Sequence, residues 1–569
     1  MTWRRRYWGH YVQVVSDPGT QRRPLPQPTL ASAAYWASGR DGVLRVAQCR
    51  DCERRIHPPL PICPTCRSRA VELMPVSGRA VVAGFSVNHQ PWLPNFPPPY
   101  VVAVVALRED DRARLTTNIV GCDPDEVYVG MPVRVRFEAQ PGDANVWLPL
   151  FEPDPDADGP GPVPEPRDVK VALRAPVSSA RFEEKVVLTG VGQSKVGRRL
   201  MVDPLSLTVD ACLAAVADAG LDLDEIDGLS TYPGPGLGGG MTEGGIVAVE
   251  EALAIRPTWV NGGSEVPGQI GSVMQAMLAV AGGLCRHVLC FRTVWEASYA
   301  ALVRSGEWSP TGGRATGMLE HRLPFGAPSA AQWIGINASH YMHRYGVGRE
   351  VLGHIAIAAR AGAARNPEAL YREPLTMEDY LSARMITTPF GLYDCDVPCD
   401  GAVAVVVSAA ETAADRPKPA VHVEAVGTQT LERLSWDQDT LAHEPQSLGP
   451  SAHLWTRTGL TTDDVDVALL YDGFTFNALS WLEGLGFCGL GEAADFIGDG
   501  SAIALGGALP LNPHGGQLSA GRLHGYGFLR EAILQLRGEA VGRQVGDARV
   551  AVVATGGGVP SGAMLLRSS

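Results

Sequence analysis

Two Cys-x-x-Cys pairs near the start of this 569-residue chain restrict its fold more than any other feature of the sequence. Cys49 and Cys52 form the first pair, and Cys63 and Cys66 form the second, which begins after ten intervening residues. Each pair places two thiolates on one side of a tight turn, and two such turns complete a tetrahedron around Zn²⁺. Because four thiolates leave no position for water, the pattern predicts a structural zinc ribbon. A redox pair or a chance cluster of cysteines is the alternative interpretation.

The cysteines outside the two pairs do not form a recognisable framework. The chain has 11 cysteines, an odd number, and those outside the pairs are scattered along the sequence. This usage is typical of reduced thiols in a cytosolic protein. We therefore predict a cytoplasmic protein whose only clustered cysteines bind zinc.

Charge and hydropathy argue against two classes of protein. The net charge of −13 is the opposite of what a nucleic-acid-binding protein normally carries. The longest uncharged stretch, residues 267–285, contains Gln269, Ser272 and Gln275. It is therefore expected to be a buried helix and not a membrane span. The first residues contain arginines without an apolar core behind them, so no signal peptide is expected.

A segment rich in proline, glycine and aspartate, residues 152–182, divides the chain. It offers almost nothing to bury, which is typical of an interdomain linker. The expected parts are a basic N-terminal tail at 1–30, a helix with the zinc ribbon at 31–76, a small β-barrel at 77–153, the linker at 154–183 and an α/β domain at 184–569.

The pattern of apolar residues differs on the two sides of the linker. Before it, residues 31–42 are expected to form a short helix with Trp36 on its apolar side, and strands are expected at 80–87, 100–107, 114–120, 131–137 and 146–151. Five short strands fit a small barrel such as the OB-fold. After the linker, an amphipathic helix is expected at 204–220 and strands at 185–192, 288–292, 402–408, 421–427, 467–471 and 549–554. Two widely separated sets of strand–helix units indicate a duplicated α/β fold.

The part before the linker resembles a known family of accessory proteins. The features that carry the resemblance are the helix with Trp36, the two cysteine pairs, the dipeptide Pro58-Pro59 and the barrel that follows. Together they are similar to the acyl-CoA-associated zinc-ribbon/OB-fold proteins, which occur beside or fused to thiolase-like enzymes. The resemblance covers residues 31–153 and implies a docking or accessory role.

The part after the linker carries a series of motifs in a specific order. They are Asp400-Gly-Ala-Val-Ala-Val-Val-Val407, Tyr471-Asp-Gly-Phe-Thr475, Asn512-Pro-His-Gly-Gly-Gln-Leu-Ser519 with Gly521-Arg-Leu-His-Gly525, and Gly556-Gly-Gly558. This order resembles the thiolase superfamily, especially its sterol-carrier-protein-x branch and the steroid side-chain aldolases. The resemblance implies a duplicated, layered αβαβα thiolase fold, a coenzyme A thioester as substrate and a homodimer.

The catalytic groups of a working thiolase are missing. Such an enzyme needs an acyl-accepting cysteine, a histidine that activates it, a second cysteine for proton transfer and an oxyanion-hole Asn or His. The corresponding positions here are near Val266 and at Arg522, Ala554 and Tyr471. There is no cysteine between Cys212 and Cys285. Ping-pong acyl transfer is therefore excluded unless another thiol, such as Cys488 or Cys395, takes over.

Retro-aldol cleavage of a β-hydroxyacyl-CoA needs no covalent intermediate. A base removes the hydroxyl proton, the Cα–Cβ bond breaks, donors hold the enolate oxygen, and an acid protonates the α-carbon. In the aldolases that this chain resembles, one tyrosine occupies the Tyr471 position and a second works across the pocket. The resemblance therefore implies that Tyr471 is the base or the acid, with Asp472 as its structural partner.

Three neighbouring residues are candidates for the second group that carries a proton. Arg522 stands at the former histidine position, Tyr526 follows four residues later, and His524 lies between them. One turn of helix between Arg522 and Tyr526 would let both face one cavity. Arg522 is also a candidate for lowering a tyrosine pKa or holding the thioester oxyanion. The backbone amides of Gly556 and Gly557 are the expected oxyanion donors, because a glycine turn exposes its N–H groups.

The sequence thus predicts a lyase. The expected reaction is the cleavage of a steroid or other bulky β-hydroxyacyl-CoA into a ketone or aldehyde and a shortened acyl-CoA such as propionyl-CoA. The alternatives are a non-catalytic carrier of acyl-CoA or lipid, and an acyltransferase that uses an unrecognised thiol. An acyl-CoA hydratase is a further expected partner.

Overall fold

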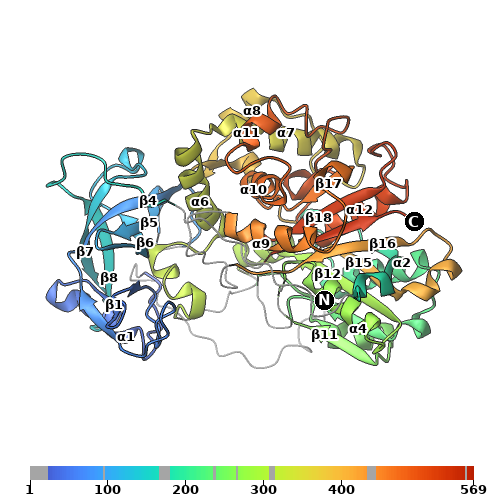
Figure 1. Ribbon diagram of the computed structural model, residues 1–569, viewed down its shortest axis with the longest axis horizontal. Coiled ribbons are helices and arrows are strands. Elements are labelled where there is room, and N and C mark those ends of the chain that lie inside the picture. The colour runs from blue at the N-terminus through green and yellow to red at the C-terminus, as the bar shows by residue number, and fades with distance from the viewer. Residues whose placement is uncertain are drawn as a thin grey trace. The chain divides into compact units, whose positions relative to one another are not determined.

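The computed structural model describes residues 23–93, 96–141, 143–165, 180–234, 239–263, 265, 267–306, 314–431, 444–557 and 561–569. The chain forms two compact units (Figure 1). The first contains the residues up to 164 together with residues 303–332, and the second contains residues 165–302 and 333–569. The segment 303–332, which is far along the sequence, therefore belongs to the same unit as the cysteine pairs.

The cysteine pairs lie in a small three-stranded antiparallel sheet with the order β2-β1-β3. Its strands are β1 (Arg45–Cys49), β2 (Arg55–Ile56) and β3 (Val71–Pro75). The expected helix at 31–42 is present as two short pieces, α1 (Ala33–Trp36) and a 3₁₀ turn (Ser38–Asp41). The second piece ends at Gly42, whose φ of 75° is left-handed. Trp36 is completely buried, as expected.

Five strands close into a barrel after the ribbon. They are β4 (Arg79–Asn88), β5 (Tyr100–Leu107), β6 (Asp110–Ile119), β7 (Pro132–Ala139) and β8 (Trp147–Pro153). The strand order is β4-β5-β6-β8-β7, and pairing of β7 with β4 closes the ring. The predicted five-stranded barrel is confirmed, because the five strands pair into one closed ring.

Residues 303–332 are joined to the first unit through a buried carboxylate. Oε1 of Glu320 accepts hydrogen bonds from Ser32 Oγ at 2.6 Å and from Trp36 Nε1 at 2.8 Å. Further along the segment, the carbonyl of Phe325 accepts from Asn118 Nδ2 of β6 at 2.8 Å. A carboxylate excluded from water in this way requires its donors, so these bonds fix the segment against the ribbon and the barrel.

The second unit is built on a mixed nine-stranded sheet with the order β11-β10-β12-β15-β9-β16-β19-β18-β17. The strands are β9 (Val186–Gln193), β10 (Gly228–Thr231), β11 (Trp259–Gly262), β12 (His287–Trp295), β15 (Asp400–Ala409), β16 (Val421–Gly427), β17 (Val467–Leu470), β18 (Val550–Thr555) and β19 (Gly562–Arg567). All six predicted strands are confirmed. The sequence did not indicate β10, β11 or β19; β10 and β11 have only four residues each, too few to show a period.

The sheet repeats one pairing pattern twice. In the first half, β9 and β15 are antiparallel, β15 and β12 are antiparallel, and β12 and β10 are parallel. In the second half, β16 and β19, β19 and β18, and β18 and β17 follow the same sequence of pairings. The halves meet at the antiparallel pair β9–β16. The expectation of an internally duplicated α/β fold is therefore confirmed.

Helices and one hairpin complete the second unit. The helices are α2 (Pro204–Asp218), α3 (Ile246–Leu253), α4 (Gly271–Ala281), α5 (Glu296–Arg304), α6 (Ala330–Tyr345), α7 (Arg349–Arg365), α8 (Met377–Ser382), α9 (Glu444–Trp455), α10 (Thr475–Leu485), α11 (Ala493–Ile497) and α12 (Tyr526–Leu536). A hairpin of β13 (Met385–Thr387) and β14 (Phe390–Gly391) precedes β15. None of the described helices is both long enough and apolar enough to cross a membrane.

Helices α4 and α12 cover one face of the sheet, opposite α2. Leu229 of β10 packs in the core that α2 forms, so its neighbour Ser230 points to the other face. There Ser230 Oγ donates to the carbonyl of Ser272 in α4 at 2.8 Å. The hydroxyl of Ser272 in turn lies 2.7 Å from that of Tyr526, the first residue of α12. The layer formed by α4 and α12 carries residues from both halves of the duplication.

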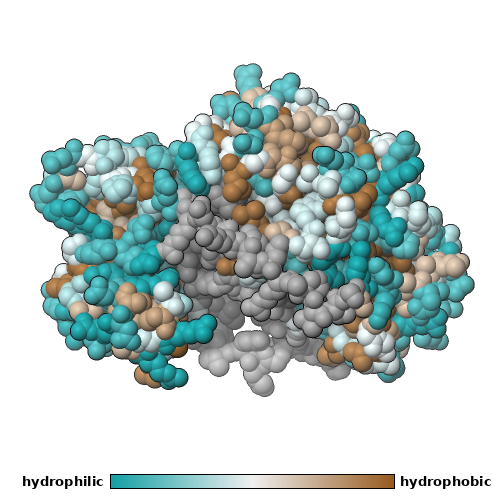
Figure 2. All heavy atoms as spheres, in the orientation of Figure 1, coloured by the Kyte–Doolittle hydropathy of each residue, from teal (hydrophilic) through white to brown (hydrophobic). Residues whose placement is uncertain are grey.

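The visible surface is mainly hydrophilic. In Figure 2, hydrophobic side chains appear in small groups among hydrophilic ones. The large exposed apolar residues of the second unit include Val247, Leu278 and Val541, which come from separate elements. The homodimer stays a prediction.

Candidate active site

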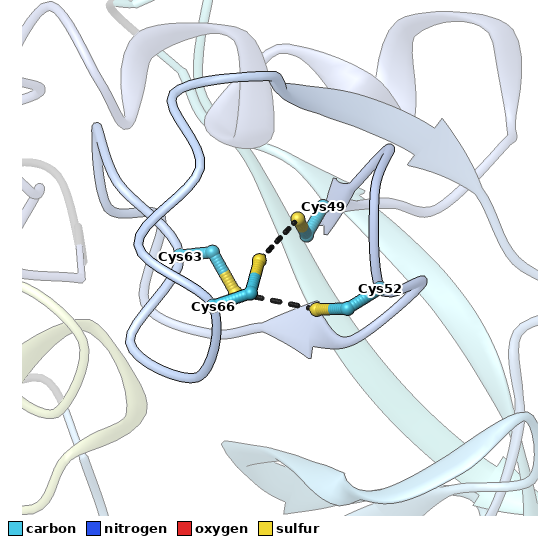
Figure 3. Close-up of side chains that lie close together, drawn as sticks. All are labelled: Cys49, Cys52, Cys63 and Cys66. Atoms are coloured by element: carbon cyan, nitrogen blue, oxygen red, sulfur yellow. Dashed lines mark hydrogen bonds between the residues drawn. The ribbon is translucent and has the colours of Figure 1, made fainter.

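The four cysteines of the ribbon converge on one point (Figure 3). Their Sγ atoms all lie within 4.8 Å of one another, and the Cys49–Cys66 and Cys52–Cys63 distances are 3.5 Å. A tetrahedron with Zn–S bonds of about 2.3 Å has edges of about 3.8 Å, so the donors fit zinc. The turns of the two Cys-x-x-Cys pairs are closed by the same hydrogen bond, from Glu53 N–H to Cys49 O in the first and from Arg67 N–H to Cys63 O in the second. The four thiols form a structural zinc site, as predicted.

Tyr471 directly follows β17, beside Ala554, the residue that the resemblance to thiolases places where those enzymes have their second cysteine. Its N–H donates to the carbonyl of Ala554 in β18 at 2.9 Å, which extends the ladder between the two strands. Its side chain is 6% exposed. Two of the positions that a thiolase would fill with catalytic groups are thus neighbours on adjacent strands, where this chain has a phenol and a methyl group.

The phenol ring of Tyr471 is held between two glycines. A Cβ atom added to Gly473 would lie 2.7 Å from the Tyr471 hydroxyl, and one added to Gly557 would lie 2.9 Å from Cε1 of the ring. Real Cβ atoms do not approach so closely, so only glycine allows the ring to lie where it does. This explains both the glycine of the Tyr471-Asp-Gly motif and part of the later glycine triplet.

The hydroxyl of Tyr471 lies among polar groups from distant segments. Burial raises its pKa above the ordinary value, and the charge of Asp396 acts in the same direction. A hydrogen bond with the side chain of Gln269 and the charge of Arg522 act in the opposite direction, and Glu265 adds a further upward contribution. The pKa stays raised, so the phenol is protonated at neutral pH and is suited to donate a proton or a hydrogen bond.

Arg522 is held by two carboxylates. Its Nε and Nη2 donate to Glu296 at 2.9 and 2.6 Å, and its Nη1 donates to Asp396 at 3.0 Å. Burial raises the pKa of Asp396 to about 6, although Arg522 acts to lower it. The guanidinium donors of Arg522 are therefore directed to protein carboxylates. Arg522 acts on Tyr471 through its positive charge, which lowers the pKa of the phenol.

Replacing Arg522 with methionine is expected to lower the free energy of unfolding by about 3 kcal/mol, because two largely buried carboxylates lose their partner. Arg530→Met is the matched control: Arg530 pairs with Glu368, whose side chain is 43% exposed, and its loss is expected to cost less than about 1 kcal/mol. Urea unfolding followed by tryptophan fluorescence measures both. Equal shifts of the midpoint would contradict the assigned role of Arg522.

Asp472 fixes the loop that contains the Asn512–Ser519 motif. Its Oδ1 accepts from the Gln517 N–H at 2.7 Å, and its Oδ2 accepts from Asn512 Nδ2 at 3.1 Å. Burial raises its pKa to about 7, against the lowering effect of these donors. A Cβ atom on Gly516, whose φ is +55°, would lie 1.8 Å from Oδ2. The carboxyl group thus contacts the backbone of the Asn512-Pro-His-Gly-Gly-Gln motif rather than open space.

The segment between Arg522 and Tyr526 is not a helical turn, so that expectation was wrong. Helix α12 begins only at Tyr526, and His524 and Gly525 have φ values of 46° and 73°. Left-handed residues next to each other interrupt a helix. As a result the side chains diverge: Arg522 binds Glu296 and Asp396, whereas the Tyr526 hydroxyl lies against Ser272 and is 0% exposed.

His524 lies between these two groups and binds a buried arginine. Nη2 of Arg292, in β12, lies 2.7 Å from its Nδ1. The carbonyl of His524 accepts from the hydroxyl of Tyr232 at 3.0 Å. The rings of Tyr232 and Tyr526 are 6.3 Å apart, so a second phenol stands close to the predicted one.

The glycine turn after β18 is fixed by α10. Trp481 Nε1 donates to the carbonyl of Gly556, and Asn477 Nδ2 donates to that of Gly557, both at 3.0 Å. The C=O and N–H groups of a trans peptide point in opposite directions. The N–H of Gly557 therefore points away from Trp481, and the ring of Tyr471 lies against the same residue.

The thiols near this site are poor nucleophiles. The nucleophile position near Val266 lies outside the described residues, but the sequence contains no cysteine there. Cys399 Sγ donates to the Arg522 carbonyl, and burial raises the pKa of this thiol and of Cys395. Burial also raises the pKa of Cys488, which lies near Glu483. A thiol reacts as its thiolate, so these groups are unsuited to acyl transfer.

Several residues of the site were missed by the sequence analysis. They are Tyr232, Arg292, Glu296 and Asp396, with Gln269 named only as a polar residue in a helix. Within the described part of the chain, Gln269 Oε1, Gln517 Nε2 and Thr555 Oγ1 are buried without hydrogen-bond partners. Such groups are rare in native interiors unless water or a ligand satisfies them. All three lie around Tyr471 or His524, which supports a ligand site there.

Comparison with protein families matches three parts of the chain. Residues 36–72 match the rubredoxin-like zinc ribbon domain of ChsH2, and residues 74–138 match its C-terminal OB-fold domain. Residues 435–566 match a thiolase C-terminal domain-like family. The zinc ribbon, the OB-fold and the thiolase-like α/β fold that the sequence predicted are therefore confirmed.

Individual relatives cover the thiolase-like part. A steroid side-chain-cleaving aldolase of Thermomonospora curvata is 34% identical over 386 residues, which are 67% of this chain and 97% of that protein. A 17-hydroxy-3-oxo-4-pregnene-20-carboxyl-CoA lyase of Mycobacterium tuberculosis is 35% identical over 67% of this chain and 99% of that protein.

A solved structure agrees with these relatives. The Ltp2-ChsH2(DUF35) aldolase superposes with a TM-score of 0.61 and 32% identity over 68% of this chain and 98% of that chain. The fold and the identity over nearly the whole length of these lyases agree: this chain belongs to the family of thiolase-like steroid side-chain-cleaving aldolases, and it is a carbon–carbon lyase.

Proposed function

We propose that this protein cleaves the Cα–Cβ bond of a β-hydroxyacyl-CoA that carries a steroid or another bulky group. The products are a ketone or aldehyde and a shortened acyl-CoA such as propionyl-CoA. The names of the related lyases support the substrate class. The observation that carries the mechanism is a buried phenol, Tyr471, beside Ala554, which the resemblance pairs with a thiolase cysteine; burial raises the pKa of this phenol.

Tyr471 is the proposed acid. Cleavage leaves a carbanion at Cα that is delocalised onto the thioester oxygen, and the reaction ends when a proton reaches Cα. A phenol with a raised pKa is protonated at the start of each turnover, and the nearby Arg522 stabilises the phenolate that forms when it gives up the proton. The charged partners of Arg522 hold the guanidinium near the ring without occupying the hydroxyl.

Asp396 is the proposed base for the β-hydroxyl. Its pKa of about 6 leaves it deprotonated at neutral pH yet basic enough to accept a proton. It comes from the loop before β15, whose backbone is bound to the Tyr471 motif through the bond from Asp396 N–H to Gly473 O at 3.0 Å. Both oxygens of Asp396 accept from Arg522 Nη1, at 3.0 and 3.3 Å, whereas the oxygens of Asp472 accept from Asn512 and Gln517.

The enolate oxygen needs donors that are fixed before the reaction. The N–H of Gly557 is one, because its peptide plane is held by Trp481 and its residue lies against Tyr471. A preorganised donor costs no reorganisation when the negative charge develops. Tyr526 is expected to contribute less, since its hydroxyl is fully buried against Ser272.

Product analysis separates this proposal from its alternatives. The full-length protein is incubated with a β-hydroxyacyl-CoA that has a bulky β-substituent, and the products and the intact protein mass are measured. We expect equal amounts of ketone and shortened acyl-CoA with an unchanged protein mass. An acyl adduct would instead support an acyltransferase, and tight binding without turnover would support a carrier. Either result overturns the proposal.

Assembly with other chains is the second part of the proposal. The ChsH2-type ribbon and OB-fold domains support a docking role for the first unit. A homodimer and an acyl-CoA hydratase partner are the proposed assemblies. Light scattering of the purified protein measures the first, and copurification with a hydratase measures the second.

A further inference from the structure

Arg292 carries a buried guanidinium that has no role in the reaction proposed above. It lies in β12, is 1% exposed, and is among the largest fully buried side chains of the chain. Burying a guanidinium is costly unless its donors are satisfied. Its Nη1 donates to the carbonyls of Thr293, at 2.8 Å, and Met241, and its Nη2 donates to Nδ1 of His524, whereas its Nε has no partner among the described residues. The guanidinium also lies 4.8 Å from the centre of the Tyr232 ring.

The contact with Arg292 determines where His524 carries its proton. A guanidinium has only donors, so Nδ1 of His524 must accept with its lone pair. A neutral imidazole that accepts at Nδ1 carries its hydrogen on Nε2. Burial holds the pKa of His524 well below its usual range, and the charges of Arg292 and Arg522 act in the same direction. The ring is therefore neutral, with one N–H in a defined position.

The backbone of His524 is fixed in an unfavourable conformation. Its φ of 46° is left-handed, which is uncommon for a residue other than glycine. Its N–H donates to Gln517 Oε1 at 3.2 Å, and its carbonyl accepts from Tyr232 at 3.0 Å. Strain of this kind persists only where the surroundings determine it, and it concentrates at functional sites.

His524 borders the surroundings of the proposed acid. A Cβ atom on the next residue, Gly525, would lie 2.8 Å from Cβ of Gln269, whose side chain hydrogen-bonds to Tyr471. Gln517, which accepts from the His524 N–H, also donates its own N–H to Asp472. Among the described residues, no hydrogen bond uses Nε2 of His524. This N–H is thus a donor of fixed position, and Gln269 and Gln517 connect its segment with Tyr471 and Asp472.

We propose that Arg292 is a positioning residue that holds His524 as the neutral Nε2–H tautomer, and that this N–H donates to the thioester oxygen as the enolate forms. The inference rests on the proposed lyase reaction. In that step the electron pair of the Cα–Cβ bond becomes the enolate double bond and the carbonyl π pair moves onto oxygen. His524 only donates a hydrogen bond and transfers no proton.

The tautomer is measured first on the unmodified protein. In full-length protein labelled with ¹⁵N-histidine at pH 7, the His524 ring signals are identified by their absence in His524→Asn. We expect a protonated Nε2 and an unprotonated Nδ1. His514, which is buried in the same unit without a partner for its Nδ1 among the described residues, is the internal comparison. A protonated Nδ1 or an imidazolium at His524 would overturn the inference without any variant of Arg292.

Two variants of Arg292 then test the link to catalysis. Arg292→Met removes the donor but keeps the volume of the stem, and we expect mixed tautomers and a kcat about 100-fold lower with KM changed less than about twofold. Arg292→Lys keeps a donor and is expected to recover most of both readouts. Unchanged kcat and tautomer in Arg292→Met would overturn the inference. If Tyr471→Phe turned over at the full rate, the proposed function would fail but the tautomer of His524 would be unaffected. The failure of the proposed function and the failure of this inference are therefore distinguishable.

Discussion

Replacing Tyr471 with phenylalanine is expected to lower kcat for carbon–carbon cleavage by about 10²–10⁴-fold, the range that proton transfer by a positioned side chain contributes. The variant removes one hydroxyl and keeps the ring between Gly473 and Gly557. The fold should therefore persist, and KM should change little. Steady-state kinetics with a β-hydroxyacyl-CoA, together with the melting temperature, measure the effect.

Tyr341→Phe is the matched control for this variant. Tyr341 in α6 is also buried, and its hydroxyl donates to Glu483 of α10 at 2.5 Å. Its loss is expected to lower stability by about 1 kcal/mol while kcat stays within about twofold. Full turnover by Tyr471→Phe, or an equal loss in Tyr341→Phe, would remove Tyr471 from the mechanism.

The double variant Cys49→Ser, Cys52→Ser is expected to lose the bound zinc and to unfold the ribbon. Structural zinc sites contribute about 10–16 kcal/mol of apparent binding free energy, which is folding free energy for a domain with so small a core. That core consists of four buried residues, two of them zinc ligands: Ala47, Cys49, Ile56 and Cys63. Metal analysis should give about one zinc per chain for the unmodified protein and none for the variant.

Hydrogen exchange locates the effect of zinc loss. Amide protons of β1, β2 and β3 should lose their protection, whereas those of β9 and β15 in the second unit should keep it. Cys122→Ser is the matched control, because Cys122 is a partly buried thiol of the first unit outside the metal site. Protection of β1–β3 that survives zinc removal would contradict the structural role of the metal.

The parts of the fold that the sequence predicted are those with a local signal. Strand β5 was expected at the residues where it occurs, because β-branched and small apolar residues run without interruption from Tyr100 to Leu107. The zinc ligands were predicted because their spacing alone defines two turns. Tyr471 was proposed from the sequence because it lies in a recognisable motif, Tyr471-Asp-Gly-Phe-Thr475.

The parts that could not be predicted depend on contacts between distant segments. In the sequence, Arg292 is an ordinary residue of a predicted strand. Only folding brings its Nη2 within 2.7 Å of Nδ1 of His524, which is 232 positions away. Asp396 and Glu296 likewise become significant only because both bind Arg522. The expected helical turn after Arg522 failed for a local reason: the left-handed conformations of His524 and Gly525 separate two side chains that helical spacing would place together.

Cleavage in D₂O without added coenzyme A is the most direct measurement of the central claim, that this thiolase fold breaks a carbon–carbon bond by acid–base chemistry and not through sulfur. We expect turnover to proceed without free coenzyme A and to place one solvent deuterium on the α-carbon of the released acyl-CoA, with a much slower release in Tyr471→Phe. A requirement for free coenzyme A, or an acylated cysteine trapped during turnover, would contradict the account.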